Sequence, residues 1–113
     1  MSLSKKQEYK LPALAADTAT DKFDTDEFLF ISTQFSWENG AAFSADVTLQ
    51  GSNDGNNWAD FPGGTSSVSG ASGTQMFDIA NTAVTFIRVN ITSVAGTADA
   101  EVDLSTKSIK FNR

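Results

Sequence analysis

The stretch VTLQGSNDGNNWADF, residues 47–61, carries the turn signal around which the fold can be predicted. It begins as an alternation of apolar and polar residues, breaks at Asn53-Asp54-Gly55, and resumes at Trp58. Asp-Gly between alternating segments is the strongest short-range signal for a β-hairpin, because glycine readily takes the positive φ angle that a tight turn needs. Residues 47–61 therefore predict a hairpin.

Trp58 directly follows this turn, and its role separates two kinds of protein. The ring can be an exposed platform for a sugar or lipid, or it can pack onto the core. We favour the core position, since aromatic residues of hairpins mainly supply packing area. Asn53 and Asn56 are expected to brace the loop through side-chain hydrogen bonds to backbone amides. The hairpin residues predicted to be structural are Asn53, Asp54, Gly55 and Trp58.

Period-two alternation recurs at residues 42–50, 85–92 and 98–104, which is typical of half-buried strands. The apolar members, predicted to face the core, are Phe43, Ala45, Val47, Leu49, Ile87, Val89, Ile91, Ala98, Ala100, Val102 and Leu104. Residues 27–37 are apolar on both faces near their start, which is typical of a central strand covered on two sides. Shorter strands are predicted at residues 9–14, 58–61, 75–79 and 108–111, with turn signals at 38–40, 53–55, 62–64 and 95–96.

About eight short strands at this spacing predict an all-β fold, a single antiparallel β-sandwich or jelly roll. At 113 residues the chain forms one domain. Residues 1–22 are expected to be an N-terminal arm or extended segment, because Pro12 and several threonines oppose a helix there. Residues 23–113 are expected to form the sandwich, with a small-residue loop at 65–73.

Charge and composition exclude several classes of function. The formal net charge is −6, so a phosphate backbone would repel the chain and no nucleic-acid partner is expected. The longest apolar run, residues 28–31, is too short to span a bilayer, and no membrane partner is expected. Without Cys or His the chain has no thiolate metal site and no histidine base. We expect no enzyme activity, no cofactor and no metal.

Two acidic groups have the ligand chemistry of a cation site. Asp99, Glu101 and Asp103 share one face of a predicted strand, and residues 24–27 form a second group. Neither has the spacing of a calcium loop. We favour a solvated outer face for the first group and a charged segment preceding the apolar strand for the second.

The hairpin residues 52–58, SNDGNNW, resemble the SNDG-x-x-W hairpin of discoidin-type (coagulation factor 5/8 C-terminal) jelly rolls. FIRVNI, residues 86–91, is similar to a later strand of that family, and the two features together also resemble small virion proteins of tailed bacteriophages. The resemblance covers residues 43–104 and implies the fold, with the hairpin Trp in the core. The family's terminal Cys pair and apolar-tipped binding loops are missing, so its ligand binding is not carried over.

Two functions remain open. The first is a non-enzymatic structural protein of a bacteriophage virion, a head decoration, tail or fibre-associated component that assembles with itself or with other virion proteins. Its predicted assembly surface comprises Phe28, Phe30, Trp37 and Phe86, and its N-terminal arm could add a strand to a neighbour. The alternative is a carbohydrate-binding β-sandwich in which Trp37, Trp58 or Tyr9 stacks on a glycan.

Overall fold

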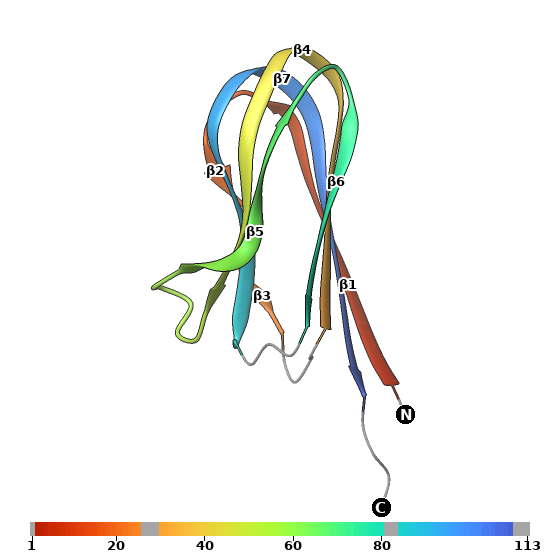
Figure 1. Cartoon of the computed structure of the whole chain (residues 1–113), viewed down its shortest axis with the longest axis vertical. Helices are drawn as coiled ribbons and strands as arrows, with labels where there is room; N and C mark the ends of the chain where they lie inside the picture. The colour runs from red at the N-terminus through yellow and green to blue at the C-terminus, as the bar shows by residue number, and fades with distance from the viewer. Residues whose placement is uncertain (1, 26–29, 81–83, 110–113) are drawn as a thin grey trace, which may run out of the picture.

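The computed structural model describes residues 2–25, 30–80 and 84–109, which form one seven-stranded antiparallel sheet (Figure 1). Its strands are β1 (Ser2–Leu14), β2 (Thr18–Ala19), β3 (Phe23–Asp24), β4 (Phe30–Ser52), β5 (Ala59–Ser69), β6 (Gly73–Ala80) and β7 (Phe86–Ile109). The predicted all-β class is confirmed. The described residues contain no helix, and hence none that could cross a membrane. Instead of about eight short strands, two of the seven are 23 and 24 residues long.

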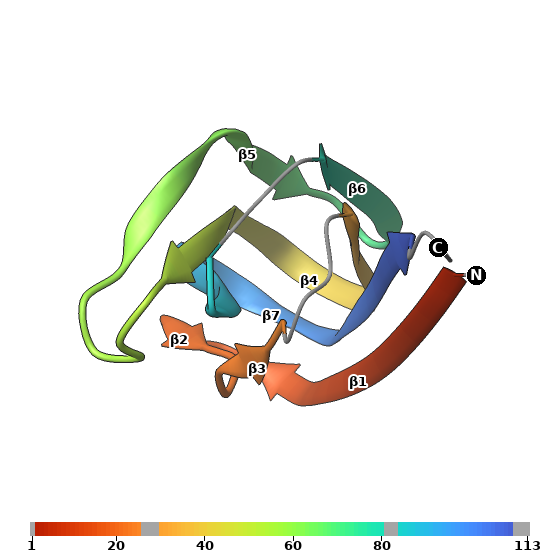
Figure 2. The same cartoon turned by 90° about the horizontal axis from the view of Figure 1, so that it is seen from below.

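The two long strands, β4 and β7, pass through both layers of a sandwich. They pair with each other from Phe30↔Lys107 to Ser52↔Phe86 and arch together over the top of the molecule in Figure 1. Layer A consists of β6, residues 30–38 of β4, residues 97–109 of β7, and β1. Layer B consists of β5, residues 44–52 of β4, residues 86–95 of β7, and the short β2 and β3. One sheet is thus folded back on itself, as the view from below shows (Figure 2).

The sheet bends where residues with left-handed backbone angles gather. The register of β4 against β7 shifts three times between Glu38 and Asp46. A bulge of this kind inserts an unpaired residue and sharpens the local bend of a strand. Positive φ angles occur on β1, β4 and β7 and in the connection between β5 and β6: Ala13 (51°), Asn39 (55°), Ala42 (52°), Gly70 (113°), Ser93 (54°) and Gly96 (66°). These residues define what we call the bend.

Side chains hold the bend in place across neighbouring strands. Asp99 on β7 accepts a hydrogen bond from the Ala13 backbone N–H at 2.9 Å and another from Asn39 Nδ2 at 3.0 Å. These bonds lower the pKa of the Asp99 carboxyl, the one from Ala13 most. On the other layer's side, Asp17 Oδ1 accepts a hydrogen bond from Val94 N–H at 3.0 Å. Carboxylates thereby satisfy backbone donors that the bulges leave unpaired.

The core fills the space between the two layers. Every apolar residue predicted from the three alternating segments is buried: Phe43, Ala45, Val47, Leu49, Ile87, Val89, Ile91, Ala98, Ala100, Val102 and Leu104. Beneath the bend, the Trp37 ring packs between Phe35 and Phe43, with centroid distances of 5.8 and 6.1 Å. The Trp37 indole donates a hydrogen bond to the Gly70 carbonyl at 3.2 Å, which ties this aromatic group to the connection between β5 and β6.

Two predictions about irregular segments are corrected. The small-residue segment 65–73 is not a loop throughout, because residues 65–69 belong to β5 and pair with β4. Val68 from this segment is buried, and Ser67 Oγ donates to Asp46 Oδ1 at 2.6 Å. Pairing with an existing strand thus outweighs the weak strand propensity of serine and glycine.

The N-terminal segment is not a free arm, because its residues 2–14 form the strand β1. β1 pairs with β7 of its own chain from Ser2↔Ile109 to Leu14↔Ala98. The start of β4 also differs from the prediction, because Phe30 is 38% exposed and only the inward face, with Ile31, is covered. The start of β4 therefore has one buried face, and β1 packs Tyr9 and Leu11 partly buried against the core.

We predict that Gly96→Ala destabilises the fold by about 2 kcal/mol or more, because alanine would be strained at φ 66° and its Cβ would collide with the carbonyl oxygens of Ala41 and Ala42. Chemical denaturation measures the loss. Gly63→Ala is the matched control, since Gly63 has φ 74° but no atom lies within 4 Å of the position that its new methyl group would take. Equal losses for the two variants would contradict a steric requirement at the bend.

Candidate functional site

The predicted hairpin is present, with residues 53–58 forming the loop between β4 and β5. Ser52 Oγ accepts a hydrogen bond from Gly55 N–H at 2.9 Å, and Gly55 has the expected positive φ of 78°. Asp54 Oδ1 accepts the backbone N–H groups of Asn56 and Asn57, both at 2.8 Å. The loop is therefore organised internally around the Asp54 carboxylate.

These bonds determine the charge state of Asp54, and a further bond connects the loop to the residue that precedes β7. The backbone N–H groups of Asn57 and Asn56, followed by the Asn57 and Ser52 side chains, hold the pKa of Asp54 well below its usual range. Asn53 Oδ1 accepts the Thr85 backbone N–H at 3.2 Å, which is the kind of bracing predicted for it. Asn56, in contrast, contributes its backbone N–H to the loop.

Trp58 does not belong to the core, so the predicted position of its ring is wrong. The side chain is half-buried, and its ring lies 4.4 Å from the guanidinium carbon of Arg88. Arg88 Nε donates to Gln50 Oε1 at 2.9 Å, placing the pair on the outer surface of layer B. Phe61 is the hairpin aromatic that packs against the core, and it does so beside Gly51, where a Cβ atom would obstruct the Phe61 ring.

The predicted assembly residues do not form one surface. Phe30 is exposed on layer A, whereas Phe86 is half-buried on layer B with Lys22 Nζ 5.0 Å from its ring centroid. The prediction that Trp37 lies on this surface is wrong, because its side chain is only 8% exposed and belongs to the core. The bulges that begin just after Trp37 turn its ring under the bend. Phe28 lies outside the described residues.

The acidic residues predicted to share one face of a strand do so, on the outside of layer A, but they have separate roles. Asp99 supports the bend, whereas the carboxylates of Glu8, Glu101 and Asp103 lie within 4.8 Å of one another. Burial, and then the charges of Glu101 and Glu8, raise the pKa of Asp103. Lys10 Nζ lies 2.7 Å from Glu101 Oε1 and partly neutralises the group, which favours the solvated-face interpretation over a cation site.

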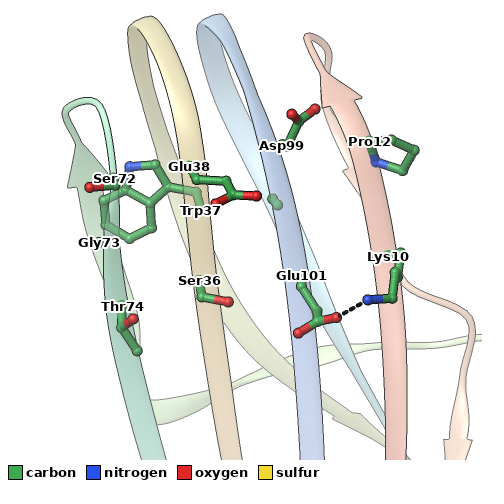
Figure 3. A pocket seen from close by; sticks show the side chains of 11 residues that line it. Lys10, Pro12, Ser36, Trp37, Glu38, Ser72, Gly73, Thr74, Asp99 and Glu101 are labelled. Carbon is green, nitrogen blue, oxygen red and sulfur yellow. Dashed lines mark hydrogen bonds and ion pairs between the residues drawn. The ribbon is translucent and has the colours of Figure 1, made fainter.

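A shallow groove of about 700 Å³ lies on layer A next to the bend (Figure 3). Its polar lining includes Lys10, Ser36, Glu38 and Glu101. The Trp37 ring also reaches it, but is turned towards Gly73 of β6, where an added Cβ would touch the ring. The groove therefore presents charged and hydroxyl groups rather than a flat aromatic platform.

Neither a protein-family model nor a curated protein sequence matches this chain. Among solved structures, it is similar to the SPBc2 prophage-derived protein YomS, with 14% identity over 94% of this chain and 96% of that one and a TM-score of 0.60. The PBSX exported protein XepA has 9% identity and a TM-score of 0.63, and the chain covers 39% of its length. A Bacillus endospore appendage protein that forms disulfide-linked pili has 10% identity over 97% of this chain and 88% of that one, with a TM-score of 0.50. At these identities the likeness shows the fold alone, and the discoidin-type resemblance remains a prediction.

We predict that Trp58→Ala lowers the free energy of unfolding by only about 1–2 kcal/mol, since it removes a half-buried cation–π contact and part of an apolar surface. Phe35→Ala, at a fully buried position, should cost about 3–5 kcal/mol and serves as the comparison. Urea denaturation of both variants measures the difference. A loss at Trp58 as large as that at Phe35 would show that its ring is a core residue after all.

We predict that Asp54→Asn lowers the stability of the fold at pH 7 and makes the stability less sensitive to a fall in pH. Because the folded-state pKa of Asp54 lies below its ordinary value of 3.8, its stabilisation is complete above that value and is lost as the pH falls through the folded pKa. Thermal melts between pH 7 and pH 2 should therefore show a steeper acid loss for the unmodified chain. Asp21→Asn makes the same charge change on an exposed residue, and an identical flattening there would contradict the assignment.

Proposed function

We propose that this chain is a non-enzymatic structural protein of a bacteriophage virion and works by subunit assembly, as a head decoration, tail or fibre-associated component. The observation that carries the proposal is the fold shared with prophage-derived YomS over nearly the full length of both chains. The hairpin at residues 52–58, which resembles that of small virion proteins, adds to it. The pilus-forming appendage protein is a further example of this type of fold in a protein that assembles.

The titratable groups support a structural role. Each described carboxylate with a shifted pKa has a local explanation: Asp54 organises the loop, Asp99 supports the bend, and Glu101 pairs with Lys10. The pKa of the Asp103 carboxyl, which lies beside that pair, is raised mainly by burial. Perturbed groups of an active site usually converge on a cleft around a nucleophile or base. Asp99 and Glu101 do line the groove on layer A, but each is already engaged in a contact of the fold, and Asp54 lies apart in the loop between β4 and β5.

The aromatic residues of the alternative function do not favour glycan stacking. A sugar platform needs a flat, exposed ring. Trp37 is buried, one face of Trp58 is covered by Arg88, and Tyr9 is partly buried, with burial raising the pKa of its phenol. The assembly function is therefore the better supported of the two.

Light scattering across protein concentration and salt tests the proposal. We expect oligomers whose fraction increases with salt, because the net charge of −6 opposes association and the screening length falls from about 10 Å at 0.1 M to about 3 Å at 1 M. Mass spectrometry of purified phage particles should detect the chain. A strict monomer at high concentration that binds glycans would instead support the carbohydrate-binding function.

A further inference from the structure

The two outer strands of layer A have regular edges over residues 4–11 of β1 and 73–80 of β6, because the pairing of β1 shifts register only beyond Leu11, whereas the edges of layer B are interrupted. In the described part of the chain, β1 pairs only with β7, and β6 pairs only with β4. In layer B, β2 and β3 have two residues each, and the pairing of β5 shifts register opposite Thr48 to Gln50. A regular strand edge presents a row of backbone donors and acceptors to which another strand can pair. Layer A is thus the layer that another chain could extend.

The register across layer A brings its two edges into correspondence. Asp78 of β6 pairs with Ser32, which pairs with Ser105, which pairs with Lys6 of β1. Through the same chain of pairs, residue 73 of β6 lies level with residue 11 of β1, and residue 80 of β6 lies level with residue 4 of β1. Each neighbouring pair is antiparallel, so β6 and β1 also run in opposite directions. A second copy displaced sideways would therefore bring its β6 against β1 in antiparallel orientation and at matching height.

We propose that copies of this chain associate edge to edge, with β6 of one copy pairing antiparallel with β1 of the next and Asp78 facing Lys6. This inference rests on the proposed assembly function and specifies its surface. Eight paired residues would form about eight main-chain hydrogen bonds, since alternate pairs in an antiparallel ladder exchange two each. Every copy uses one edge and leaves the other open, so the contact is heterologous and builds a ring or a filament.

Charge supports this pairing over a random encounter of edges. β1 carries three lysines and one glutamate in a chain whose net charge is −6, whereas Asp78 is the one charged residue of β6. Lys6 and Asp78 are both exposed, and the described residues offer neither an ion-pair partner. A basic edge facing an acidic one lessens the repulsion between copies and sets the register. Met76, 51% exposed on β6, would be covered by the incoming strand.

Exchanging the two charges tests the proposal. Lys6→Glu and Asp78→Lys should each weaken self-association about tenfold, because an opposite-charge pair becomes a like-charge pair. Mixing the two variants should restore association, since every contact in an alternating assembly then joins opposite charges. Sedimentation velocity measures the dissociation constants, and circular dichroism confirms that each variant is folded. Asp21→Lys, on the loop between β2 and β3, makes the same charge change as Asp78→Lys and should leave the Asp78–Lys6 contact intact.

The possible results separate this proposal from the broader one. If the unmodified chain assembles and neither variant matters, edge pairing is wrong while the assembly function stands. If only one of the two variants weakens association, Asp78 does not face Lys6, and either result overturns the proposed contact between β6 and β1. If the unmodified chain is a strict monomer under all conditions, both the edge pairing and the assembly function fail.

Discussion

The bend that carries β4 and β7 from one layer to the other is the constraint on which the rest of this structure depends. Both layers are built from the same two strands, so the bend must also keep apolar side chains facing inwards on both sides. In β4 the buried apolar residues are odd-numbered before and after it, as Trp37 and Phe43 are. In β7 they change from odd to even between Ile91 and Ala98. A shift of one residue reverses the faces of a strand, and the bulges supply this shift where it is needed.

Three carboxylates of this acidic chain accept hydrogen bonds from its own backbone where the strands are irregular or end. Asp99 and Asp17 accept N–H groups at the bend, and Asp54 accepts them in the loop between β4 and β5. An ionised carboxylate is a strong acceptor for backbone donors that irregular strands leave unpaired. These three are among the 14 acidic residues that give the chain its net charge of −6, so groups that stabilise the bend and the loop also add to the repulsion between copies. Association therefore requires a surface where this repulsion is locally reduced.

The faces of the sandwich offer little to a partner, which draws attention to its edges. Phe30 and Met76 are the large apolar residues exposed in the described part of the chain, and they lie on neighbouring strands four residues apart in register. Trp58 and Phe86 are each covered on one side by a cation. Backbone pairing at a strand edge needs no apolar patch, because hydrogen bonds provide the contact and side chains select the register.

The sequence by itself determined the all-β class, the inward face of three strand segments and the position of the loop at residues 53–58, because period-two alternation and Asp-Gly chemistry are local properties. It did not determine that residues 38–40 and 95–96 lie within continuous strands, since left-handed residues occur in both turns and bulges. Nor did it distinguish Phe61 from Trp58 as the core aromatic, or pair β1 with β7. Those outcomes depend on contacts between segments far apart in the chain. Only the folded sheet decides which strand edge is available for pairing and which face of a strand is covered by other side chains.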